Sequence, residues 1–140
     1  MEDSTIKKDT ESPFSKDMEE IIVNEKTGNL SIPKDLIVRD LNNLQRISIG
    51  KVNPSICCST ISLTNLEQLE MVEFLSLRVD HLCIQNCPKL QSIFCFAISG
   101  SKFDIQNLPM LETINMVNSC YEFIDAFIIR GSAFWKGMIL

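Results

Sequence analysis

The chain of 140 residues has few of the residues on which recognisable catalytic sites depend. It contains one histidine, His81, and no P-loop, Gly-x-Gly-x-x-Gly, Gly-x-Ser-x-Gly or His-Glu-x-x-His motif. His81 follows Asp80 in a stretch expected to be a loop entering a repeat, and chance explains this pair better than a catalytic dyad does. The sequence therefore predicts a protein that is not an enzyme and has no cofactor.

Glycine, proline, positive charge and long apolar runs are also scarce. Five glycines and five prolines exclude collagen-like chains and Pro-rich linkers. The densest apolar runs, residues 94–98 and 126–129, are far shorter than the roughly 20 residues of a membrane helix. Thirteen basic residues against 18 acidic ones give a net charge of −5, whereas nucleic-acid binding favours a basic face. We expect neither a nucleic-acid partner nor a membrane partner.

The first residues lack the basic start and the apolar core of a secretory signal. The six cysteines are therefore expected to be reduced, in an intracellular and cytoplasmic protein. Residues 1–29 hold eight acids and four lysines, a net charge of −4, which leaves −1 for the rest. We predict an acidic, partly disordered N-terminal segment at 1–29 and a folded domain at 30–140.

A repeated pattern dominates the remaining sequence. Residues 82–95 and 103–116 align at an offset of 21, each with Ile-Gln-Asn, a proline two residues later and apolar residues at matching positions. Looser copies place the Asn-equivalent position at 40, 65, 86, 107 and 131, at intervals of 25, 21, 21 and 24 residues. Residues 18–23 fit the second half of an earlier copy, and a hairpin through residues 26–29 is the competing interpretation.

Each repeat consists of two short segments of alternating apolar residues joined by a turn. Such a unit offers one apolar ridge, which only stacked copies can bury, so the pattern predicts a solenoid. Its period lies in the range of leucine-rich repeats. The turn carries a column in which an amide can bond backbone groups of its own or the adjacent coil, a structural role. These predicted turn-ladder residues are Asp40, Asn65, Asn86 and Asn107, and Gly131 interrupts the column.

On these units, residues 36–140 resemble a leucine-rich-repeat protein, and residues 83–93 and 103–114 are similar to the irregular BspA-like repeats of single-celled eukaryotes. The resemblance implies a mainly β, right-handed solenoid of the α/β solenoid class, with a parallel β-sheet and about five coils. It also implies protein recognition without catalysis. The family places Asn or Cys three residues past the last apolar site of the strand, where this chain has other residues (Val52, Leu77, Ile98 and Ser119). Short strands are therefore expected opposite the sheet, with few or no regular helices.

The outward residues of the predicted sheet form two columns that we take as the partner-binding face. They are Arg46, Met71, Ser92 and Thr113, and then Ser48, Glu73, Phe94 and Asn115. Met71 and Phe94 are the anchors expected for an interface. The predicted function is a non-catalytic module that binds a protein partner on this face. The alternative is that loop residues cover both side chains.

Two other functions remain open. Residues 135–140 complete a strand pattern with no polar cap after it, which predicts a structural or truncated fragment that self-associates through its C-terminal edge. A metal-binding or Cys/His enzyme is the remote alternative, because His81, Cys83, Cys87 and Cys95 lack paired Cys-x-x-Cys spacing and two of them take core positions. No metal site is predicted. The pair Cys57-Cys58 is placed in a loop.

Overall fold

A computed structural model describes residues 14–23, 35–50, 56–117, 124–131 and 138–139. In these residues the chain forms eleven β-strands and no helix. The strands are β1 (Glu20–Val23), β2 (Asp35–Arg39), β3 (Arg46–Gly50), β4 (Ile56–Thr64), β5 (Met71–Leu75), β6 (Leu77–Gln85), β7 (Ser92–Phe96), β8 (Ser99–Gln106), β9 (Thr113–Val117), β10 (Ile124–Arg130) and β11 (Met138–Ile139).

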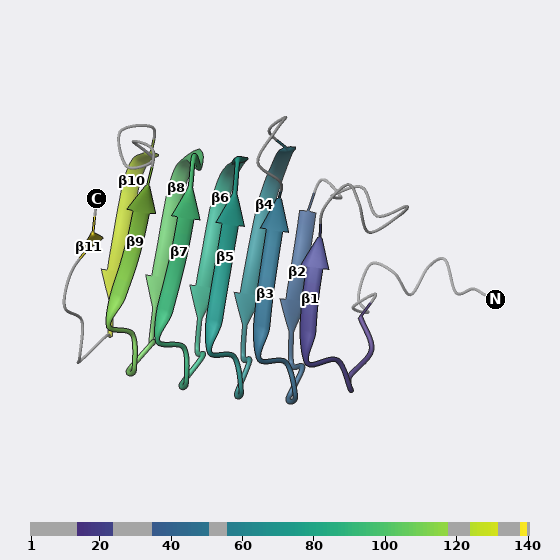
Figure 1. Cartoon of the computed structure of the whole chain (residues 1–140). Helices are drawn as coiled ribbons and strands as arrows, with labels where there is room; N and C mark the ends of the chain where they lie inside the picture. The colour runs from purple at the N-terminus through teal and green to yellow at the C-terminus, as the bar shows by residue number, and fades with distance from the viewer. Residues whose placement is uncertain (1–13, 24–34, 51–55, 118–123, 132–137, 140) are drawn as a thin grey trace.

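The strands form two parallel sheets that lie face to face (Figure 1). The odd sheet has the order β1-β3-β5-β7-β9-β11, and the even sheet has the order β10-β8-β6-β4-β2. The chain passes from an even strand to the next odd strand and back, so each pair such as β4–β5 forms one turn of a solenoid. The predicted mainly β, parallel solenoid is confirmed. Strands stand opposite the odd sheet in place of helices, as expected, but β4 and β6, with nine residues each, are longer than the short strands predicted.

Four turns, β2–β3 to β8–β9, stack with β1 before them and with β10 and β11 after them in the described part of the chain. The sequence predicts about five coils. The strand pattern predicted at residues 135–140 is present as β11, which pairs with β9 through Met138 and Ile139. Its flanking residues lie outside the described residues, and self-association through this edge stays a prediction.

The core lies between the two sheets and consists of the inward residues of the described strands together with turn residues such as Leu66 and Leu69. In the odd sheet Ile47 is in register with Val72, and Ile49 with Phe74. From the even sheet, residues such as Ile84 point toward them. Twenty-nine apolar residues of the described chain pack here with Cys58 at their margin, and Phe14, Met18 and Ile129 lie partly buried against them. The core is rich in Ile and Val. Because β-branched side chains fit a pleated surface, these residues favour strands over helices.

The even sheet bends at the same place in three successive strands. The bend residues are Ser59, Asp80 and Ser101, and none of them takes part in the pairing that continues on either side. Two consecutive residues point outward there, so the inward positions shift by one. The bend explains why a strict alternation of apolar residues is not visible in these stretches of the sequence.

The bend also corrects two sequence predictions. Cys57 and Cys58 lie in β4, and His81 lies in β6, whereas the sequence placed all three in loops. The physical reason is that the strands run through the bend without interruption. Their hydrogen-bonded partners in the next coil remain in register before and after it.

The solenoid begins before residue 30. Strand β1 is parallel to β3, with Ile21 opposite Ile47, and Ile21 and Val23 are only 2% exposed. The earlier copy predicted at residues 18–23 is therefore confirmed, because these apolar side chains are buried in the core of a parallel sheet. Residues 26–29, where the competing hairpin was placed, lie outside the described residues. This strand lies within residues 1–29, which the sequence assigned to the acidic segment. Residues 1–13 lie outside the described residues.

Candidate binding surface

The predicted turn ladder follows one corner of the solenoid. Its members Asp40, Asn65, Asn86 and Asn107 all have left-handed backbones, with φ between 55° and 58°. Asparagine and aspartate tolerate this conformation better than other residues with a side chain do. Each backbone N–H donates to the last carbonyl of the next even strand, as from Asn86 to Gln106 at 3.2 Å. The column is thus selected by backbone conformation.

The side chains of the ladder bond to one another. Asn86 Nδ2 donates to Asn65 Oδ1 at 3.2 Å, and Asn107 Nδ2 donates to Asn86 Oδ1 at 3.1 Å. The sequence predicts instead that these amides bond to backbone groups of a buried turn. In the structure the three amides are exposed and bond to one another. Gly131, with a φ of 67°, ends the column, since a Cβ there would lie 2.7 Å from Asn107 Oδ1.

Substitutions at Asn86 test the reason for this column. We expect Asn86→Gly to destabilise least, Asn86→Ala by about 1–2 kcal/mol and Asn86→Val most, because a β-branched residue resists positive φ most strongly. Urea unfolding monitored by circular dichroism measures the order. If valine were tolerated as well as glycine, the conformational explanation would be wrong.

Both predicted outward columns exist on the odd sheet. Pairing places Arg46, Met71, Ser92 and Thr113 in one column, and Ser48, Glu73, Phe94 and Asn115 in the next. All eight are at least partly exposed, and Met71 is 38% exposed. Ser48 Oγ donates to Glu73 Oε1 at 2.9 Å, which links adjacent coils. The structure therefore brings the predicted face together.

A third outward column continues this face and is not predicted from the sequence. It consists of Leu75, Phe96 and Val117, aligned in register on β5, β7 and β9. Val117 is 41% exposed, and the other two are half-buried. Extending the alternation by two residues beyond Glu73, Phe94 and Asn115 would have found it, because strand residues two apart share a face.

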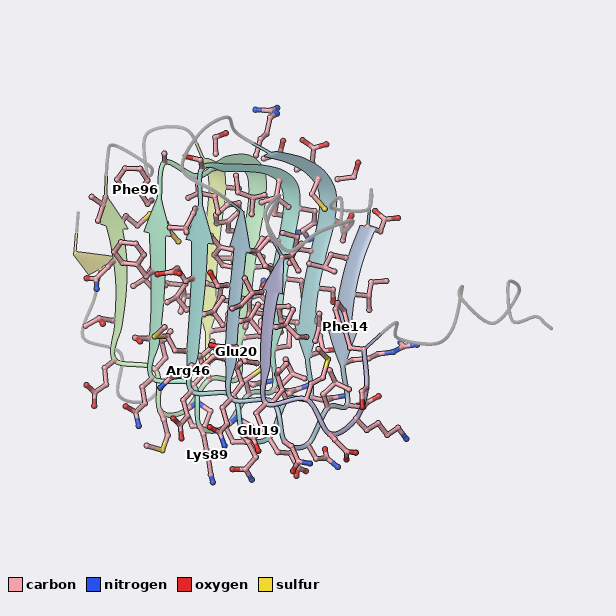
Figure 2. The ribbon with its side chains drawn as sticks, turned by 45° about the vertical axis from the view of Figure 1, so that its right-hand side comes forward. Phe14, Glu19, Glu20, Arg46, Lys89 and Phe96 are labelled. Atoms are coloured by element: carbon pink, nitrogen blue, oxygen red, sulfur yellow. The ribbon has the colours of Figure 1, made fainter. Side chains whose placement is uncertain are left out.

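The apolar patch is formed by five of these outward side chains on three neighbouring strands. Its members are Met71, Leu75, Phe94, Phe96 and Val117. Side chains directly opposite in register are about 5 Å apart, and diagonal ones are within reach of aromatic and long side chains. Figure 2 shows Phe96 near the upper end of the odd sheet, where its strands end. Such a contiguous patch is typical of an interaction site.

The other end of the same face is acidic. The residues before the odd strands form a Glu/Gln row of Glu19, Gln45, Glu70, Gln91 and Glu112, joined by backbone hydrogen bonds of 2.7–3.2 Å between neighbouring coils. Because Glu and Gln alternate, like charges lie two coils apart, about 10 Å, which reduces their repulsion. Figure 2 shows Glu19, Glu20 and Arg46 toward the lower end of the sheet, opposite to Phe96.

The outward face of the even sheet has no comparable arrangement in the described residues. Its columns are Asp35, Thr60, His81, Lys102 and Ala126, then Ile37, Ser62, Cys83, Asp104 and Ile128, then Arg39, Thr64, Gln85, Gln106 and Arg130. Polar groups bond within this face, as Gln106 Nε2 does to Asp104 Oδ1 at 2.9 Å. Charges of both signs are mixed there, so the odd sheet is the better candidate surface.

The predicted cysteine positions are not brought together. Cys87 and Cys95 lie in the core. Cys83 lies half-exposed on the outer face of the even sheet, and His81 lies exposed on the same face. Burial raises the pKa of the Cys87 thiol to about 11, and it also raises that of Cys58. These thiols stay protonated near neutral pH. Within the described ranges, no three His, Cys, Asp or Glu side chains are placed to hold a metal ion.

Comparisons with known proteins add no identification. No protein-family model, curated protein or solved structure matches the chain. The described part of the chain contains no helix with the length and hydrophobicity needed to cross a lipid bilayer. The resemblance to leucine-rich repeats therefore stays an expectation from the residues.

Proposed function

We propose that this protein is a non-catalytic recognition module that binds a protein partner on the outward face of the odd sheet. The apolar patch carries the proposal, because five large apolar side chains on adjacent strands point away from the core. Such anchors dominate the energy of protein interfaces. Because the sheet already holds these side chains at fixed spacing, little backbone conformational entropy is lost when a partner binds. The protein is proposed to act within the cell.

The rest of the face supports a docking role rather than chemistry. Its polar residues flank the patch, as the rim of a protein interface does. Thr113, Ser92 and Asn115 offer hydrogen bonds but no titratable group. Self-association through the C-terminal edge is the alternative function, and it would involve β10 and β11 rather than this face.

The double variant Met71→Asp, Phe94→Asp is expected to lose the partner while remaining folded. Two anchors that each contribute about 2 kcal/mol would together lower affinity by roughly 1000-fold. Affinity capture followed by a binding titration against the captured protein measures the loss, and circular dichroism measures folding.

The matched control is Ile37→Asp, Ile128→Asp, which adds the same two charges to the even sheet. It should bind as the wild type does. A folded Met71→Asp, Phe94→Asp protein that retains the partner would contradict the proposal. Light scattering against concentration distinguishes self-association, which Met71→Asp, Phe94→Asp should not change, because neither residue lies on β10 or β11.

A further inference from the structure

Charge on the odd sheet is one-sided. In the described strands of this sheet and the residues just before them, the acids are Glu19, Glu20, Glu70, Glu73 and Glu112, and the base is Arg46. Glu20 and Arg46 lie directly opposite in register. A face with this excess of carboxylates attracts basic groups, and the net charge of −5 for the whole chain adds to that attraction.

The column of Leu75, Phe96 and Val117 lies at the opposite end of the strands from the Glu/Gln row, with Met71, Glu73 and Phe94 between the two. On β5, Glu70 comes before the first strand residue and Leu75 is the last one. Five residues of strand separate them by about 16 Å. This apolar column and the Glu/Gln row therefore form two parallel stripes along the solenoid axis. A partner that crosses all the strands would meet both stripes along its length.

The spacing of the stripes matches an α-helix laid along the solenoid axis. Neighbouring parallel strands are about 4.8 Å apart, and one turn of helix rises 5.4 Å. Apolar residues of a helix at positions i, i+3 or i+4, and i+7 would therefore meet Leu75, Phe96 and Val117 in turn. A helix with its side chains is about 10–12 Å wide, so long basic side chains on its flank can reach the carboxylates at the far stripe.

We infer that the odd sheet binds a basic amphipathic helix of a partner protein, with the helix across the strands, its apolar side on the apolar patch and its Lys or Arg side chains toward the Glu/Gln row. This inference rests on the proposed function, since it names the chemistry of the partner for that same face. The even sheet lacks both stripes in its described residues. The partner is thus distinguished by charge as well as by hydrophobicity.

The test is a selection from a random 16-residue peptide display library on the full chain. Peptides that bind the wild type but not Met71→Asp, Phe94→Asp are sequenced. We expect an excess of Lys and Arg over acids, with apolar residues at helical spacing, and circular dichroism of synthetic copies should show helix formation on binding. Face-dependent peptides that are neutral, acidic or extended would overturn this inference and leave the proposed function standing. No face-dependent peptide at all would overturn the proposed function itself.

A charge reversal then tests the orientation of the helix. Glu19→Lys, Glu70→Lys changes the net charge from −5 to −1, since each substitution adds two charges, and Asp35→Lys, Asp80→Lys on the even sheet makes the same change. The selected peptides should bind the first variant about tenfold more weakly at low salt and the second about as well as wild type. Equal effects of the two variants would contradict the placement of the basic side chains on the Glu/Gln row.

Discussion

Replacing Phe74 by alanine is expected to lower the free energy of unfolding by about 3–5 kcal/mol, the usual cost of removing a buried phenylalanine. Phe74 is fully buried, and its register partners Ile49 and Cys95 hold it from both sides in the middle of the odd sheet. Its removal leaves a cavity between the sheets that the neighbouring coils cannot close without moving. A loss of this size is a large part of the roughly 5–15 kcal/mol that stabilises a typical domain.

Phe94 provides the matched control for this prediction. It lies on the adjacent strand β7 but points away from the core. Phe94→Ala should cost only about 1 kcal/mol or less, the scale of a cross-strand contact. Urea unfolding of both variants, monitored by circular dichroism, gives the comparison. Equal losses would mean that the strands are shifted by one residue, because such a shift exchanges the two faces.

Gly100→Val is expected to be the most damaging single substitution at the bend of the even sheet. A Cβ at this position would lie 1.9 Å from the carbonyl oxygen of Val79 and 2.9 Å from the ring of Phe103. Because the nearest atom belongs to backbone, β8 must move away from β6. We expect a loss of about 3 kcal/mol, at the upper end of ordinary overpacking, while Ser101→Ala at the exposed neighbouring position should cost little.

The next coil explains why glycine stands there. In register, Val79 of β6 is opposite Gly100 of β8, and Leu82 is opposite Phe103. Both positions therefore carry side chains of medium size in β6, whereas in β8 a glycine stands near the large ring of Phe103. Gly100→Val combined with Phe103→Leu should therefore regain part of the stability lost in Gly100→Val. A double-mutant cycle measures the coupling, and strictly additive losses would contradict this compensation.

The candidate surface could be predicted only in part. Alternation of apolar and polar residues placed Met71 and Phe94 correctly on the outer face of the sheet, because the period of two is a local property of any strand. The same rule does not say where a strand ends, so the column of Leu75, Phe96 and Val117 was missed. These residues complete the apolar patch, which exists only when three strands from different repeats lie side by side.

The turn ladder shows the same division. The repeat spacing identified the positions of Asn65, Asn86 and Asn107 from the sequence. The left-handed backbone and the bonds between successive amides were not predicted, because they depend on the geometry of the corner and on the distance between coils. The interpretation of the column as structural nevertheless agrees with these contacts.

The sequence by itself determined that the chain stacks in repeats, which residues face the core and where each repeat turns. These properties follow from residue spacing, since a strand has a fixed period and a single unit cannot bury its own apolar ridge. The tertiary structure alone decided the bend in the even sheet and the separation of apolar and acidic stripes on the odd sheet, and it decided that residues 20–23 pair as a strand of the solenoid, which the sequence had left open. Each of these depends on contacts between residues about 21–26 positions apart, which stacking brings together and local pattern does not encode.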